Sequence, residues 1–115
     1  MITPDYTITV DDPKDADMSV VVNSVPYGTE IQITMRYAQD ENTAYKDIEE
    51  VAQWTETLKQ GDNTIKPQQD IDKFGIYWYE IQDTRNNKTN PYINSAKLKV
   101  ESSGVYTLQY NESYN

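Results

Sequence analysis

The side chains that most often carry out catalysis at neutral pH are missing from this chain. It has 115 residues, and none of them is histidine or cysteine. Without an imidazole or a thiol, Ser–His and Cys–His mechanisms are excluded, and so is a thiolate metal site. Paired carboxylates could hydrolyse a glycosidic bond, but nothing in the sequence places two of them in a cleft. We therefore expect a protein that is not an enzyme and that holds no cofactor.

One acidic cluster offers oxygen ligands of the kind that calcium prefers. The segment DDPKDAD, from Asp11 to Asp17, falls at a predicted turn. An EF-hand loop would also need a central glycine and a distal glutamate at fixed positions, and the spacing here does not match. A solvated acidic turn accounts for the cluster, so we predict no metal site.

Aromatic side chains are the remaining groups that could recognise a ligand. In the segment FGIYWYEIQD the alternation predicts a strand with Tyr77 and Tyr79 inward and Trp78 outward. A ring on the outer face of a sheet can stack on a sugar, contact another subunit, or lie under a loop or tail. We take Trp78, Tyr92 and Tyr106 as candidate binding residues, and the covering of Trp78 by a loop or tail as the main alternative.

The charge of the chain excludes several classes of partner. Nineteen acidic residues against ten basic ones give a net charge of -9, which repels nucleic-acid phosphate and anionic lipid. No apolar run approaches the roughly 18 residues of a membrane-spanning helix. We expect no nucleic-acid binding and no membrane insertion. No export signal precedes the first predicted strand, so a chain that starts naturally at Met1 would be made and kept in a cytoplasm.

Period-two alternation predicts that the chain is mainly β. Strands are expected over residues 6–10, 18–25, 30–38, 75–81, 96–100 and 105–110. Turn signals rich in Gly, Pro, Asn and Asp separate them. Short strands with regular turns are typical of an antiparallel sandwich or barrel. The length predicts a single domain, 1–115, with short arms at both ends.

The segment from 43 to 60 fits two structures. Read with a helical period, one face carries Ala44, Ile48, Val51, Ala52, Thr55 and Leu58, and Gly61 stands where a helix would end. Read with period two, EVAQWTETL is a strand with Ala52 and Trp54 inward. The local pattern favours a helix slightly, whereas the surrounding strands favour a strand.

These patterns resemble bacterial and phage immunoglobulin-like domains. The segment FGIYWYEIQD is similar to the F strand of that family, with Gly75, Tyr77 and Tyr79 in its G-x-Y-x-Y pattern. The resemblance implies an immunoglobulin-like antiparallel β-sandwich of about seven to eight strands, with an inserted helix near 43–60 if the helical pattern holds. It also implies that Tyr77 is a tyrosine corner, whose hydroxyl bonds the backbone near the start of its strand.

The same resemblance assigns a core. GTEIQITM is similar to strand B, so Met35 and Tyr79 would take the places of the two cysteines of antibody domains. Trp54 would be the strand C tryptophan. GDNTI resembles the lead into strand E, and INSAKLKV resembles strand G. Two features depart from the family: the long gap between Met35 and Trp54, and the additional segment VYTLQY, which would add a strand at an edge or reach a partner.

Domains of this family are mostly non-catalytic spacers and adhesion modules on bacterial surfaces and on phage particles. Our first hypothesis is a structural protein of a phage virion, assembled in the host cytoplasm and contacting other structural proteins as a head-decoration, neck or tail-surface subunit. The alternative is an extracellular adhesion or carbohydrate-binding module that recognises a cell-surface glycan. A third hypothesis, an inhibitor that mimics nucleic acid, would need a concentrated acidic stripe, and the acidic residues here are dispersed.

Overall fold

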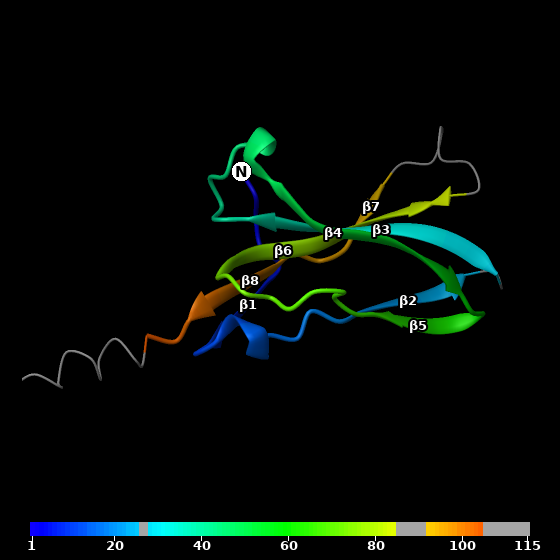
Figure 1. The fold of residues 1–115 in the computed structure, drawn as a ribbon, viewed down its shortest axis with the longest axis horizontal. Coiled ribbons are helices and arrows are strands. Elements are labelled where there is room, and N and C mark those ends of the chain that lie inside the picture. The colour runs from blue at the N-terminus through cyan, green and yellow to red at the C-terminus, as the bar shows by residue number, and fades with distance from the viewer. Residues whose placement is uncertain (26–27, 85–91, 105–115) are drawn as a thin grey trace, which may run out of the picture.

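The described chain is built almost entirely of strands. The computed structural model describes residues 1–25, 28–84 and 92–104. Its strands are, in chain order, β1 (Tyr6–Val10), β2 (Val20–Val25), β3 (Thr29–Ala38), β4 (Glu49–Leu58), β5 (Gly61–Ile65), β6 (Gly75–Asp83), β7 (Ile93–Asn94) and β8 (Leu98–Ser102) (Figure 1). Two 3₁₀ turns, η1 (Pro13–Asp15) and η2 (Tyr45–Asp47), are the helical elements of the described residues. The mainly-β prediction is confirmed, and the strand predicted over 105–110 lies outside the described residues.

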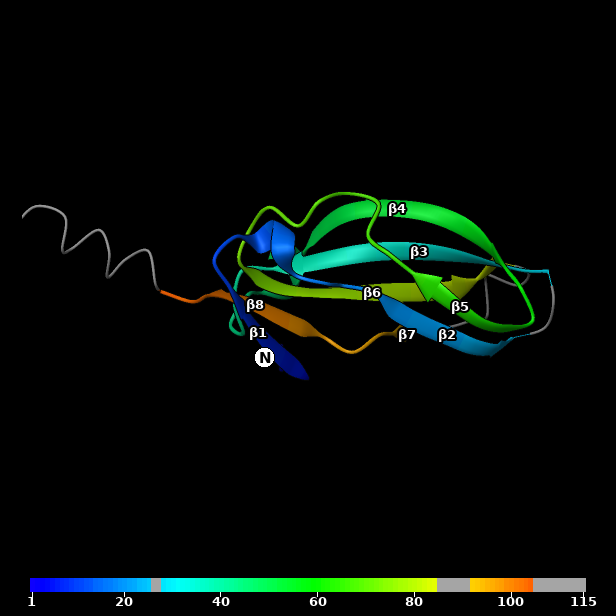
Figure 2. The same ribbon diagram turned by 90° about the horizontal axis from the view of Figure 1, so that it is seen from below.

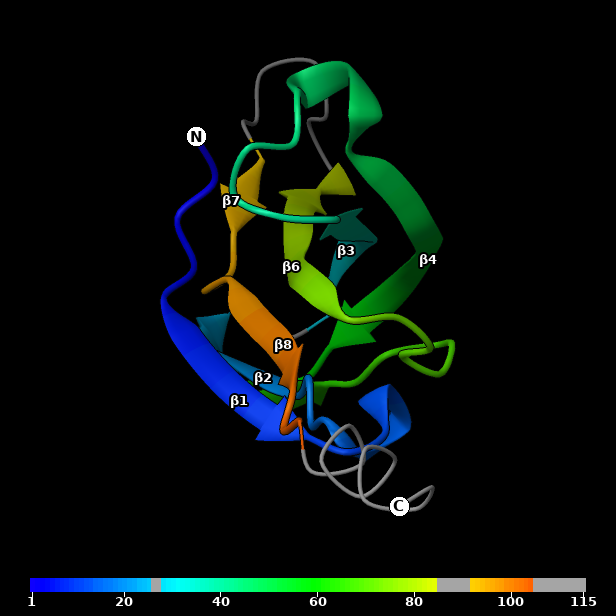
Figure 3. The same ribbon diagram turned by 90° about the vertical axis from the view of Figure 1, so that its left-hand side faces the viewer.

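The strands form a large sheet and a small one. The large sheet has the order β1-β8-β6-β3-β4, with β7 paired to one end of β6, and the small sheet is the antiparallel pair β2-β5. The small sheet lies across one face of the large sheet, while the N-terminus and η2 lie toward the other (Figures 1 to 3). Among the described residues, no helix is long and apolar enough to cross a bilayer.

One edge of the large sheet is parallel, which corrects the prediction of a wholly antiparallel sandwich. β1 runs parallel to β8, with Tyr6 opposite Leu98 and Val10 opposite Ser102. The other described pairings are antiparallel. A hairpin fixes the antiparallel orientation of neighbouring strands, whereas β1 and β8 come from opposite ends of the chain and no short turn joins them.

The helix considered over 43–60 is wrong, because most of that segment is strand β4. β4 pairs with β3 along its length, but the register shifts between Met35 and Arg36, opposite Ala52 and Glu50. Val51 is the extra residue of this bulge. The bulge places Val51, Trp54 and Leu58 against one core, and their spacing of three and four residues imitates a helical face.

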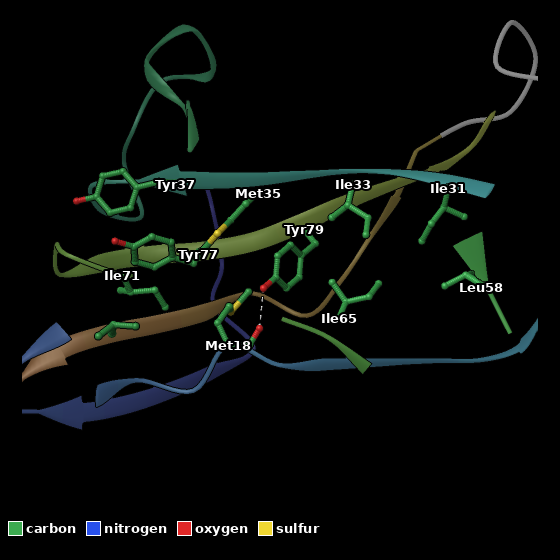
Figure 4. Packing of buried hydrophobic residues seen from close by; sticks show 11 residues of the cluster. Met18, Ile31, Ile33, Met35, Tyr37, Leu58, Ile65, Ile71, Tyr77 and Tyr79 are labelled. Carbon is green, nitrogen blue, oxygen red and sulfur yellow. Dashed lines mark hydrogen bonds between the residues drawn. The ribbon is translucent and has the colours of Figure 1, made fainter. Parts of the chain in front are cut away.

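A single cluster of buried side chains fills the space between the two sheets (Figure 4). Met35 and Tyr79 are fully buried there, and the half-buried Trp54 meets the Tyr79 ring edge-on, with 6.1 Å between the ring centroids. The Tyr79 hydroxyl donates a 2.8 Å hydrogen bond to the carbonyl of Met18, which precedes β2. Tyr79 therefore links the large sheet to the chain segment that leads into the small one.

The register corrects the assignment of strand B. Met35 and Tyr79 are directly opposite each other on the hydrogen-bonded neighbours β3 and β6. Strands B and F of an immunoglobulin domain lie in facing sheets, so GTEIQITM cannot be strand B. Trp54 likewise lies on β4, one strand further from β6 than the resemblance implies. An alternating apolar face looks the same on any strand that faces the core, so the pattern does not distinguish neighbouring strands.

Tyr77 makes the hydrogen bond that the resemblance implies. Its hydroxyl donates to the carbonyl of Lys73 at 2.8 Å, and the Tyr37 hydroxyl donates to the next carbonyl, that of Phe74, at 2.6 Å. The two rings lie 4.9 Å apart. Gly75 is required beside them, because it has a φ of +147° and a β-carbon there would stand 2.4 Å from the Tyr37 ring.

Candidate functional site

Trp78, the first of the predicted aromatic binding residues, is buried and not presented on the surface. Trp78 does point away from the main core, but its side chain is only 4% exposed. It packs with Ala38 and Ile76 in a second cluster, and Ile2 and Ile48 cover that cluster. A sugar therefore cannot reach the face of the Trp78 ring. Neighbouring segments cover the ring, as the alternative prediction for Trp78 proposed.

Paired charges surround this second cluster. The Lys97 Nζ atom lies 5.3 Å from the centre of the Trp78 ring, a cation–π distance. Arg36 Nε donates to Glu80 Oε1 at 2.9 Å, and Lys99 Nζ donates to Glu41 Oε2 at 2.9 Å. The bond from Lys99 lowers the pKa of the Glu41 carboxyl. The two ion pairs satisfy their own charges, and the first of them also lines a small hollow. That hollow has a volume of about 210 Å³ and is lined by Arg36, Tyr45, Lys46, Ile48 and Glu80.

Of the other two predicted binding residues, Tyr92 and Tyr106, the structure describes only Tyr92. Tyr92 directly precedes β7, and 49% of its side chain is exposed. Tyr106 lies outside the described residues. Of the predicted aromatic residues that are described, Tyr92 alone has a ring that a partner can reach.

An apolar groove runs along the seam between the two sheets, and we call it the seam groove. It has a volume of about 520 Å³ and lies between β2 and the β6–β7 end of the large sheet. Its apolar lining is Val20, Val21, Val22, Ile81, Ile93 and Ala96. It continues at Val20 and Ala96 into a smaller hollow of about 160 Å³ beside Tyr6 and Leu98.

A kink between β7 and β8 opens the groove. β6 pairs with β7 at Glu80 and Ile81, and with β8 only from Gly75 to Tyr77. At the break, Ser95 exchanges two hydrogen bonds with the Tyr79 backbone: its amide donates to the Tyr79 carbonyl and its hydroxyl accepts from the Tyr79 amide, each at 2.9 Å. The kink leaves Ile93 67% exposed at the mouth of the groove.

The β2 strand presents an unprotected edge to this groove. Among the described strands it hydrogen-bonds to β5 alone, so alternate backbone N–H and C=O groups point the other way. Its sequence, VVVNSV, has no charged residue and no proline, which are two of the usual protections of an edge strand. Its pairing with β5 is regular from Val20 to Val22 and becomes irregular between Val22 and Val25. The edge strand β4, in contrast, carries three glutamates.

A groove with these properties suits an extended peptide. A free strand edge supplies main-chain hydrogen bonds, and an apolar lining accepts alternate side chains, which is how proteins bind a segment as an added strand. One end of the smaller hollow is polar: the Asp17 carboxylate accepts from the Ser19 amide at 3.0 Å, and bonding to Ser19 lowers the pKa of Asp17.

No group of three or more His, Cys, Asp or Glu residues in the described chain could hold a metal ion.

No protein-family model, curated protein or solved structure matches this chain. The seam groove was also not predicted from the sequence. Two local signals point to it: the uncharged run SVVVNSV, and the residues INSAK, where one predicted strand is interrupted.

Proposed function

We propose that this chain is a non-enzymatic immunoglobulin-like protein that works through contacts with other proteins. The strand order supports the fold. If β2, β3, β4, β5, β6 and β8 correspond to strands B, C, C′, E, F and G, the sheet G-F-C-C′ faces the pair B-E, as in immunoglobulin domains. The bond from Tyr77 to Lys73 supports the same fold, because it is the tyrosine-corner contact of strand F.

The observation that carries the interaction is the free edge of β2 beside the seam groove. Strand A of an immunoglobulin domain lies in the sheet of strand B, but here β1 pairs with β8 at the opposite sheet. The position beside β2 is therefore open among the described strands. An open apolar edge is unfavourable in an isolated protein and favourable where a partner strand fills it.

The proposed setting is a phage particle, in which the chain is a head-decoration, neck or tail-surface subunit assembled in the host cytoplasm. Non-catalytic immunoglobulin-like modules are common there, and a net charge of -9 keeps free copies from premature association. Quantitative mass spectrometry of gradient-purified particles should find the chain in a fixed ratio to the major structural proteins. Abundant chain in the lysate with none in the particles would contradict this setting.

The alternative is a glycan-binding adhesion module, and the exposed ring of Tyr92 is the observation that favours it. A panel of glycans and cell-wall polysaccharides should distinguish the two functions, with the Tyr92→Ala variant as the test and Tyr45→Ala, at another exposed tyrosine, as the control. Our proposal expects no specific glycan binding. Binding that is lost only in Tyr92→Ala would support the adhesion module instead.

A further inference from the structure

We propose that the seam groove binds residues 105–110 of a second copy of this chain, so that copies join head to tail by strand addition. The inference rests on the proposed function, because it takes the groove to be a protein-binding site and names the segment that fills it. Three observations favour this occupant: the alternation of the segment, its lack of charge, and the point from which it leaves the fold.

The alternation of VYTLQY matches a groove that accepts every second side chain. In an extended segment, Tyr106, Leu108 and Tyr110 point to one side, and Val105, Thr107 and Gln109 to the other. Two tyrosines and a leucine would enter an apolar groove lined by valine, isoleucine and alanine. The backbone of the segment would meanwhile pair with the free edge of β2.

Charge favours an uncharged occupant for contacts between copies. Each copy carries a net charge of -9, so two copies repel each other at long range. Residues 105–110 contain no charged side chain, and neither does β2. This segment therefore enters the groove without a like-charge contact, and salt should strengthen the association by screening the overall repulsion.

The geometry favours a second copy over the same copy. Ala96 lines the groove, and β8 then carries the chain away from it to Gly104. At roughly 3.3 Å per extended residue, the five residues of β8 alone carry the chain about 15 Å along the sheet. Residue 105 of the same copy follows Gly104 beyond that far end, so the segment cannot lie along the main groove from its first residue. Each copy would be both donor and acceptor, which makes a heterologous contact.

The test uses two complementary full-length variants in sedimentation velocity. Leu108→Asp disables the donor segment, and Ile93→Asp, at a residue exposed in the free fold, disables the groove. Each variant alone should self-associate at least about ten-fold more weakly than the parent chain. A mixture of the two should form a 1:1 dimer, because one intact donor still meets one intact groove. Tyr45→Asp carries the same charge change at an exposed residue outside the groove and should associate like the parent.

Hydrogen exchange locates the contact on β2 directly. On association of the parent chain, those amides of Val20 to Val22 that point away from β5 should become protected, and a synthetic peptide of residues 104–111 should protect the same amides in Leu108→Asp. A parent chain that stays monomeric at high concentration and salt, or variants that fail to complement each other, would overturn the inference.

The virion setting and the contact between copies can be contradicted independently of each other. If particles contain the chain but the purified chain neither self-associates nor binds the peptide, the contact between copies is wrong and another protein fills the groove. If the chain assembles through this contact but is absent from particles, the contact stands and the virion setting is wrong.

Discussion

At the scale of single residues, three tyrosine hydroxyls bond backbone carbonyls in or beside the core. Tyr79 bonds Met18, Tyr77 bonds Lys73, and Tyr37 bonds Phe74. A tyrosine suits these positions because its ring fills apolar space while its hydroxyl donates to a carbonyl. The bond to Met18 is buried, so that carbonyl would otherwise lack a partner in the core. Three of the ten tyrosines of the chain therefore contribute to the core that the aliphatic side chains form.

We expect Tyr79→Phe to lower the free energy of unfolding by about 1–3 kcal/mol, because the variant leaves the Met18 carbonyl without its hydrogen bond. Urea denaturation followed by circular dichroism measures the change. Tyr45→Phe, at an exposed ring, is the control and should change the free energy of unfolding by less than about 0.5 kcal/mol. Equal stability of the two variants would show that the bond between Tyr79 and Met18 contributes nothing.

The same tyrosines predict a loss of stability at alkaline pH. Burial raises the pKa of Tyr37, Tyr77 and Tyr79 above the ordinary value of 10.0. Because the folded pKa lies above the unfolded one, the stabilisation is complete below pH 10 and is lost as the pH rises further. Each tyrosine that stays protonated only in the folded state should then cost about 1.4 kcal/mol per pH unit.

Urea titrations between pH 8 and pH 11 measure that slope. Replacing Tyr79 with Phe should make the slope shallower than that of the parent chain. A free energy of unfolding that is constant across this range would contradict the assignment.

At the scale of elements, a change at the edge of β2 should weaken association between copies without lowering the stability of the fold. The Val21 side chain is 60% exposed, so a lysine there adds a charge to the edge with little effect on the core. We expect Val21→Lys to change the free energy of unfolding by less than about 0.5 kcal/mol but to abolish association of the chain. Denaturation and sedimentation of the same sample test both statements, and loss of association together with loss of folding would count against the edge as a binding site.

How far the sequence predicts these elements depends on whether their signals are local. Alternation correctly separates the inward Tyr77 and Tyr79 from the outward Trp78, because a strand has only two faces. It fails at β4, where the bulge at Val51 changes the period. It also cannot tell which strands are neighbours, so Met35 and Tyr79 were expected in facing sheets. The seam groove was missed because three separate elements, β2, β6 and β7, line it.

At the scale of the whole molecule, the net charge of -9 opposes compactness. Repulsion among dispersed acidic groups lowers the stability of the folded chain at low ionic strength, and salt screens it. We expect the thermal midpoint to rise as sodium chloride increases from low to physiological concentration. Differential scanning calorimetry at low protein concentration, with Leu108→Asp used to prevent association, measures this rise. A midpoint that falls with salt would show that the ion pairs Arg36–Glu80 and Lys99–Glu41 outweigh the repulsion.

The parallel pairing of β1 with β8 has a consequence for how the chain is made. Asp5 accepts a hydrogen bond from the Lys97 amide, 92 positions along the chain, and β1 cannot join its sheet until β8 has left the ribosome. Contacts of such long range slow folding. During synthesis β1 therefore waits without its partner in the large sheet, and the sheet gains this edge only after β8 has emerged.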